Sequence, residues 1–135
     1  TAQRPGGVDD EFNTGCMRFN TTIGSLEYYD GTAWVLPGKL TFSTVSSSTS
    51  VTASNVYFVN TGGGGVTLTL PASPNLGDEI RFYDVAKTFD SNALTVARNG
   101  KLIQGDSADL TVSTESAAFT LCFSGDSYGW RIFSI

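Results

Sequence analysis

Paired carboxylates are the side chains of this sequence best suited to chemistry. They come together in Asp9-Asp10-Glu11, in Asp78-Glu79, and in Asp106 with Asp109. Ca²⁺ takes carboxylate oxygens, and glycoside hydrolysis uses two carboxyl groups about 5 to 10 Å apart. The acidic triplet lacks the spacing of an EF-hand loop, and acidic residues at turn edges are common in strand connections. We therefore interpret these carboxylates as solvated or structural, and expect neither catalytic residues nor a metal site.

Nucleophile and imidazole chemistry is limited by composition. The chain has no histidine, which excludes Ser-His-Asp and Cys-His catalysis, histidine metal ligands and switching by imidazole protonation. Cys16 and Cys122 are the only cysteines. We interpret them as two buried free thiols, with a single disulfide as the alternative.

Four consecutive glycines, Gly62 to Gly65, precede the alternating run VTLTLP. A phosphate-binding P-loop requires a Lys and a Ser or Thr after its glycines, and the dinucleotide fingerprint requires a following helix. Neither is present here. The glycines are therefore predicted to form a turn that uses positive φ angles, and no cofactor is expected.

Aromatic residues flank two turns with a shared layout, in LEYYDGTAWV and LCFSGDSYGWRI. Exposed aromatic rings can stack on sugars, so Tyr29 and Tyr128 are candidate glycan contacts. The favoured alternative is that each Trp packs over a cross-strand partner and closes the core. Four large side chains are expected to be buried: Trp34, Phe82, Leu121 and Trp130.

Charge and hydropathy exclude two classes of partner. Charged residues make up 16% of the 135 residues, and 8 Lys and Arg against 13 Asp and Glu give a net charge of −5. Nucleic-acid binding draws most of its affinity from neutralised phosphates, so an acidic chain is a poor candidate. Because no apolar run approaches the ~20 residues of a membrane-spanning helix, no membrane insertion is expected.

Alternation with period two dominates the pattern of apolar residues. In EIRFYDV, Ile80, Phe82 and Asp84 alternate with the residues between them. Asn99-Gly100 separates two short runs and is a strong signal for a two-residue hairpin. Strands are also expected in MRFNTT, SLEYYDGTAWVL, VTLTLP, ADLTVS, AAFTLCFSG and GWRIFSI. Asp30-Gly31 is predicted to be the turn within SLEYYDGTAWVL. No stretch of ten or more residues has helical spacing, so we predict an all-β protein with an antiparallel β-sandwich or barrel-like domain.

Two segments interrupt this pattern and divide the chain. Residues 1–15 are rich in Gly, Asp and Pro without apolar periodicity, and are predicted to be an extended arm ordered by contact with neighbours. Residues 43–55 are rich in Ser and Thr and suit either a linker or a strand. A boundary near Pro37-Gly38 separates an arm and β-hairpin module (1–37) from a β domain (38–135).

Two stretches resemble proteins of bacteriophage particles. Residues 2–35 are similar to a short module of virion proteins that opens with Gln-Arg-Pro, continues with Gly-x-x-Arg-Phe/Tyr-Asn-Thr and closes with Leu-Glu-x-Tyr-x-Gly-x-x-Trp. Residues 66–105 resemble a β domain of phage tail fibres and other appendages, which ends in a Gly-x-x-x-Trp strand. The matching positions are Gln3-Arg4-Pro5, Gly15, Arg18-Phe19-Asn20-Thr21, Leu26-Glu27-Tyr28, Gly31, Trp34, Val66 to Pro71, Gly77-Asp78 and Gly125 to Trp130.

The resemblance implies a non-enzymatic structural protein on the virion exterior. The expected form is a homotrimer that acts as a fibre or appendage module, or as a decoration (cement) protein on the capsid. One alternative is a receptor- or glycan-binding module of a tail fibre. A second is a fragment of a polysaccharide-degrading tail spike, which the short chain disfavours.

The N-terminal arm is the expected attachment segment. It has too few apolar residues for a core of its own, so it is predicted to gain order against another subunit or another virion protein. Arg4 can pair with a partner carboxylate through two hydrogen bonds, and Pro5 limits the entropy lost on docking. The predicted partner contacts are Gln3, Arg4, Pro5, Asp9, Asp10 and Phe12.

Overall fold

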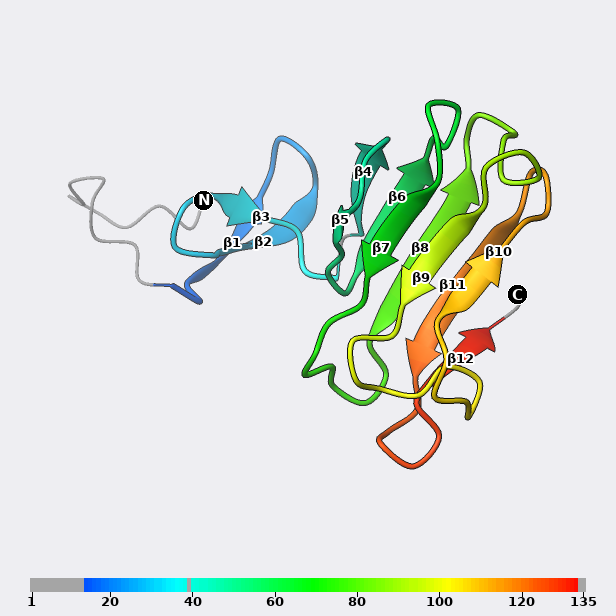
Figure 1. Ribbon diagram of the computed structural model, residues 1–135. Helices are drawn as coiled ribbons and strands as arrows, with labels where there is room; N and C mark the ends of the chain where they lie inside the picture. Colours follow the sequence, from blue (N-terminus) through cyan, green and yellow to red (C-terminus); the bar gives the residue numbers. More distant parts are fainter. Residues whose placement is uncertain (1–13, 39, 134–135) are drawn as a thin grey trace. The chain divides into compact units, whose positions relative to one another are not determined.

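The computed structural model in Figure 1 describes residues 14–38 and 40–133 of the chain. The chain divides into two compact units, Thr1–Lys39 and Leu40–Ile135, close to the boundary predicted near Pro37-Gly38. All regular elements within the described ranges are strands, so the all-β prediction is confirmed.

The first unit contains a three-stranded antiparallel sheet. Strand β1 (Met17–Asn20) pairs with β2 (Ser25–Tyr29), which pairs with β3 (Trp34–Val35). The β2–β3 turn is the predicted Asp30-Gly31 turn. The Asp30 carboxylate accepts hydrogen bonds from the N–H groups of Thr32 and Ala33, both at 2.8 Å, and Gly31 has a φ of 104°. The side chain of Asp30 therefore fixes the return of the chain into β3.

The second unit consists of two sheets that face each other (Figure 1). One sheet has the order β12-β11-β8-β6-β4 and the other the order β10-β9-β7-β5. The strands are β4 (Thr41–Val45), β5 (Thr49–Ser50), β6 (Asn55–Val59), β7 (Val66–Thr69), β8 (Glu79–Asp84), β9 (Leu94–Ala97), β10 (Leu110–Val112), β11 (Ala118–Phe123) and β12 (Trp130–Phe133). Of the two predicted alternatives, a β-sandwich and a barrel-like domain, the structure has the sandwich. The Ser/Thr-rich segment 43–55 enters both sheets and is not a linker.

Strand pairing in this sandwich is mixed rather than antiparallel throughout. From β4 to β9 the chain alternates between the two sheets, so β4, β6 and β8 run parallel, as do β5, β7 and β9. Only β10, β11 and β12 add antiparallel pairs. Parallel neighbours need a crossover connection, and here each crossover includes one strand of the opposite sheet. Strands β4 to β9 thus form a flattened coil.

The hairpin predicted at Asn99-Gly100 is half correct. Both residues have positive φ (47° and 86°), and the N–H of Lys101 donates to the carbonyl of Arg98 at 3.1 Å, as in a type I′ turn. After the turn, however, the chain does not return along β9. Strand β9 pairs with β10 instead, and Ile103 forms only isolated bridges. The local turn was predictable, but the partner strand lies further along the chain.

The core fills the space between the two sheets. Alternation directs Val66 and Leu68 of β7 inward. On β8 the alternating residues Ile80, Phe82 and Asp84 are buried, of which Phe82 was expected inside. Their partners come from both sheets and include Tyr57, Val59, Leu94, Val96, Leu121, Phe123 and Trp130. Three of the four large side chains expected inside are fully buried. Trp34 is only partly buried, because its three-stranded sheet has no second layer of its own.

The glycines Gly62 to Gly65 connect β6 to β7 as a turn, in agreement with the prediction. The N–H of Gly64 donates to the carbonyl of Thr61 at 3.0 Å, and the N–H of Gly62 donates to Asn60 Oδ1 at 2.8 Å. Of the four, Gly64 alone has a positive φ, 138°. This segment carries the chain across from one sheet to the other.

Candidate interaction surfaces

The predicted contacts of the N-terminal arm, Gln3, Arg4, Pro5, Asp9, Asp10 and Phe12, lie outside the described residues. Glu11 of the acidic triplet lies there too.

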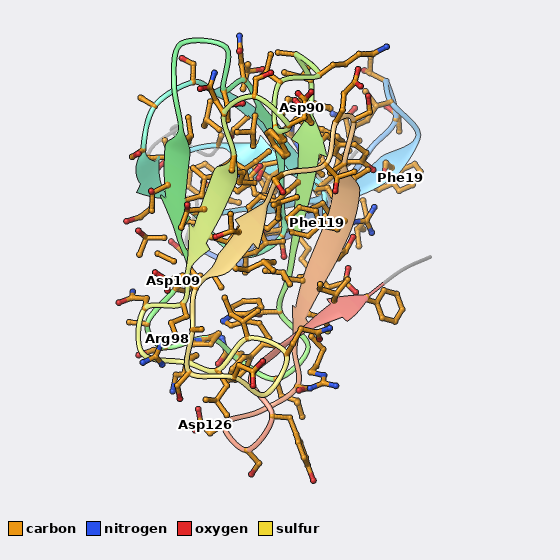
Figure 2. All side chains as sticks on the ribbon, turned by 45° about the vertical axis from the view of Figure 1, so that its right-hand side comes forward. Phe19, Asp90, Arg98, Asp109, Phe119 and Asp126 are labelled. Carbon is orange, nitrogen blue, oxygen red and sulfur yellow. The ribbon has the colours of Figure 1, made fainter. Side chains whose placement is uncertain are left out.

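Two of the carboxylates weighed for catalysis, Asp78 and Asp109, accept backbone hydrogen bonds. Asp78 Oδ2 accepts a hydrogen bond from the N–H of Asn75 at 2.8 Å, which closes the turn before β8. Asp109 Oδ1 accepts one from the N–H of Arg98 at 2.9 Å. In Figure 2, Arg98 and Asp109 lie together near one end of the sandwich. No group of three or more Cys, Asp or Glu side chains in the described ranges could hold a metal ion.

Asp84 is the carboxylate that sequence reasoning left without a role. It ends β8 with 7% of its surface exposed and accepts three backbone N–H groups. These come from Thr88 at 3.0 Å, Phe89 at 3.1 Å and Ser116 at 3.0 Å. Burial raises the pKa of Asp84, but the hydrogen bonds outweigh it, so the pKa is lowered from 3.8. In the sequence, this role could have been suspected from the inward-facing position of Asp84 in EIRFYDV. The hydrogen bonds make Asp84 an anchor for the β8–β9 and β10–β11 connections.

The two cysteines are free thiols and partly buried. Burial raises the pKa of the Cys122 thiol, and the negative charges of Glu79 and Asp78 raise it further. Cys122 is therefore protonated at neutral pH and is a poor nucleophile.

One face of the N-terminal sheet is apolar. Met17 lies opposite Tyr28, which lies opposite Val35, and Phe19 lies opposite Leu26, so alternation places all five side chains on the same side. We call these five residues the apolar face. Met17 is 59% exposed, Phe19 53% and Leu26 42%, and Figure 2 shows Phe19 projecting from its strand. A further apolar side chain in the β1–β2 turn, Ile23, is 53% exposed.

The opposite face of the same sheet is polar and well connected. Arg18 Nε lies 2.9 Å from Glu27 Oε2, and the guanidinium lies 4.2 Å from the centre of the Trp34 ring. The rings of Tyr29 and Trp34 have centroids 5.6 Å apart. The candidate glycan residue Tyr29 is thus partly buried in this cluster. Arg18 fixes the sheet from this side through a charge pair and a cation–π contact.

The second candidate glycan residue, Tyr128, is 65% exposed in the turn between β11 and β12. The N–H of Gly129 donates to the carbonyl of Gly125 at 2.8 Å and closes this turn. Lys101 Nζ lies 2.7 Å from Asp126 Oδ1 and ties the turn to the loop between β9 and β10. Figure 2 shows Asp126 at the end of the sandwich opposite Asp90. Tyr29 and Tyr128 belong to different units.

An aromatic row crosses the outer face of the five-stranded sheet. Phe42 stacks on Phe58 with ring centroids 6.1 Å apart, and Phe58 packs against Tyr83 at 5.8 Å. Phe42 is 63% exposed and Tyr83 40%. Arg81 and Glu79 approach within 3.6 Å of each other beside this row. Unlike the apolar face, this surface therefore mixes aromatic and charged side chains.

Comparison with protein-family models and with curated protein sequences finds no match for the chain. The described ranges also contain no helix that is long and apolar enough to cross a membrane.

Proposed function

We propose that the chain is a non-enzymatic structural protein of a bacteriophage particle, displayed on the exterior as a homotrimer. It serves either as a fibre or appendage module or as a decoration protein on the capsid. The observation that carries the proposal is the apolar face, since a three-stranded sheet with such a face requires a partner layer. The motifs of residues 2–35 and 66–105 supply the virion context through their resemblance.

The chemistry of the described side chains suits this role. Asp78, Asp84 and Asp109 are engaged with backbone N–H groups, and so hold connections rather than offer a reactive pair. The two-layer sandwich is tied together by Asp84 and by the core, which gives a rigid module. Short strands and a low content of charged residues suit a rigid exterior protein.

Electron microscopy of the particle tests the proposal directly. Gold-labelled antibodies raised against residues 40–133 should decorate intact particles at regular positions, and the purified chain should have the mass of a trimer. Label found only in lysate outside particles would contradict the virion assignment. A monomer at high concentration would contradict the trimer.

A glycan-binding module is the second candidate, because Tyr128 is 65% exposed at the tip of a closed turn. In this case the phenol ring would stack on a host-surface sugar. A glycan array probed with the intact protein should then show signals that Tyr128→Ala removes and Tyr128→Phe retains. The matched control is Tyr83→Ala, which removes a partly exposed tyrosine from another surface. An array without signal would contradict glycan binding, and the structural role would then be the one candidate left.

A further inference from the structure

We propose that the outer edge of β4 is a self-association site, and that its occupant is β4 of a second copy of this chain, paired antiparallel about Ser43. The pairing joins two chains through a twofold axis. It is independent of the proposed trimer and of the virion assignment.

The flattened coil of β4 to β9 is covered at one end and open at the other. At the end of the coil, β11 pairs with β8 and β10 pairs with β9, so antiparallel strands cover both sheets. At its start, β4 and β5 are the edges of the two sheets. Edge strands present unpaired N–H and C=O groups, which a strand of another molecule can bind. We call the side of β4 that faces away from β6 the open edge.

The backbone groups of the open edge belong to Phe42 and Thr44. The N–H of Thr41 and the carbonyl of Val45 form hydrogen bonds with residues that flank β6. Because backbone groups alternate in direction along a strand, every second residue from Thr41 faces β6, whereas Phe42 and Thr44 face outward. Within residues 14–38 and 40–133, neither of these two has a backbone partner on its outward side.

The opposite edge of the same sheet, β12, is covered within the chain. The N–H of Trp130 donates to the carbonyl of Leu102 at 2.8 Å, and the N–H of Gln104 donates to the carbonyl of Trp130 at 2.8 Å. The N–H of Ile132 donates to Gln104 Oε1 at 3.0 Å. The loop after β9 therefore takes the place of a further strand beside β12. In this sheet β4 is the edge left for another molecule.

The open edge lacks the features that normally prevent edge pairing. From Leu40 to Gly77 the sequence contains no charged residue, and β4 and β5 contain no proline. Charged side chains and proline are common protections of exposed edges. Symmetric contacts bring identical residues close together, and like charges across an interface are costly. An uncharged edge avoids this cost, which favours a second copy of the same strand as the occupant.

The open edge is self-complementary in one register. Antiparallel pairing centred on Ser43 sets Phe42 of each copy opposite Thr44 of the other. Both are hydrogen-bonded pairs, so every outward N–H and C=O of the two residues finds a partner. Any other centre sets Phe42 or Thr44 opposite a residue beyond β4 or opposite one that faces its own β6, because β4 spans Thr41–Val45.

The same register covers an exposed aromatic ring. Phe42 is 63% exposed on the outer face of the sheet and stacks on Phe58 with ring centroids 6.1 Å apart. In the proposed pair, the Thr44 side chain of the second copy lies against this ring. Cross-strand pairs of aromatic and β-branched residues stabilise antiparallel sheets. Two short strands make a small interface, so we expect association that depends on concentration.

Light scattering of the full chain over a range of concentrations tests the proposal. The mass should at least double between dilute and concentrated solution. Thr44→Lys puts a charge on the open edge and should weaken the association about tenfold or more. The matched control is Thr111→Lys, which makes the same change at an exposed threonine of β10, an edge of the other sheet, and should associate like the wild type.

Cysteine cross-linking tests the register. In a hydrogen-bonded antiparallel pair the Cα atoms lie about 5.5 Å apart, which a disulfide can span. Phe42→Cys and Thr44→Cys chains, mixed and oxidised with glutathione disulfide, should form a covalent dimer of about 29 kDa, twice the chain mass of 14.3 kDa. Neither variant alone should form it faster than the wild type, whose Cys16 and Cys122 set the background. This measurement decides the matter if Thr44→Lys fails to fold.

The outcomes separate the edge pairing from the proposed trimer. A mass that rises with concentration and falls in Thr44→Lys, or the mixed disulfide, supports the pairing. Phe42→Cys chains that cross-link with each other but not with Thr44→Cys overturn the register, and with it the proposed pair. A mass that neither changes with concentration nor responds to Thr44→Lys, without the mixed disulfide, overturns the site. The mass at high dilution shows separately whether the dissociated form is a monomer or a trimer.

Discussion

Gly129 lies directly against the backbone carbonyl of Leu102, at the point where β12 begins. The N–H of Trp130 donates to the same carbonyl at 2.8 Å, and Gly129 has a φ of 72°. A Cβ atom at Gly129 would overlap the carbonyl group and the side chain of Leu102. This close approach locks the loop after β9 onto the start of β12, beside the largest buried side chain of the core.

Gly129→Ala should therefore lower the free energy of unfolding by about 3 kcal/mol, from backbone strain together with displacement of the Leu102 segment. Gly100→Ala is the matched control. Gly100 also has a positive φ, 86°, but no atom lies within 4 Å of its Cβ position. Its cost should be about 1 kcal/mol, from conformation alone. Urea unfolding of both variants measures the difference, and equal losses would contradict the role of the Leu102 contact.

Asp84 should make stability fall at acid pH. Its pKa is lowered in the folded state, so its contribution is fully present above the ordinary value of 3.8. That contribution is lost as the pH falls below 3.8 through the lowered folded-state pKa. Thermal unfolding between pH 2 and pH 7 should show this decline in the wild type and a smaller decline in Asp84→Asn. At pH 7 the variant should lose roughly 2 kcal/mol, because an amide accepts these N–H groups less well.

The control for this experiment is Asp90→Asn, which makes the same chemical change at an exposed residue of the connection after β8. It should keep the wild-type acid profile. If Asp84→Asn and Asp90→Asn behave alike, the three hydrogen bonds at Asp84 do not govern acid stability.

The two tryptophans should differ in their effect on stability. Trp130 is fully buried with its ring centroid 5.3 Å from that of Phe123, so Trp130→Ala should cost about 3 to 5 kcal/mol. Trp34 is partly buried and contacts Arg18, so Trp34→Ala should cost about 1 kcal/mol. Chemical denaturation followed by circular dichroism gives both values. A mild effect of Trp130→Ala would contradict its place in the core.

Removal of the N-terminal arm should separate attachment from folding. We expect deletion of residues 1–13 to abolish incorporation into particles, because the predicted partner contacts, including Arg4 and Phe12, are lost. The sandwich of residues 40–133 should keep its circular dichroism spectrum and its unfolding midpoint, because its core lies wholly in that unit. Quantitative immunoblots of purified particles measure the incorporation. Normal incorporation of the truncated chain would place the attachment elsewhere.

Sequence alone determined the elements whose signal is local. The alternation of Ile80, Phe82 and Asp84 predicted that they share one face of β8, because successive side chains of a strand point to opposite faces. The expected burial of Phe82 made this the inner face. Asp30-Gly31 and Asn99-Gly100 predicted turns, because their conformations depend on the two residues themselves. The all-β class followed from the same periodicity.

Only the tertiary structure decided which strands are neighbours. Alternation is the same in parallel and antiparallel strands, so nothing in VTLTL or in EIRFYDV states that β7 and β8 lie in different sheets. The hairpin prediction failed after Asn99-Gly100 because long-range contacts, such as Trp130 with Leu102, direct that segment toward β12. The apolar face could not be predicted from the sequence for a similar reason. Met17, Phe19, Leu26 and Tyr28 lie on one side only in the register that β1 and β2 adopt, and register is a property of the paired strands.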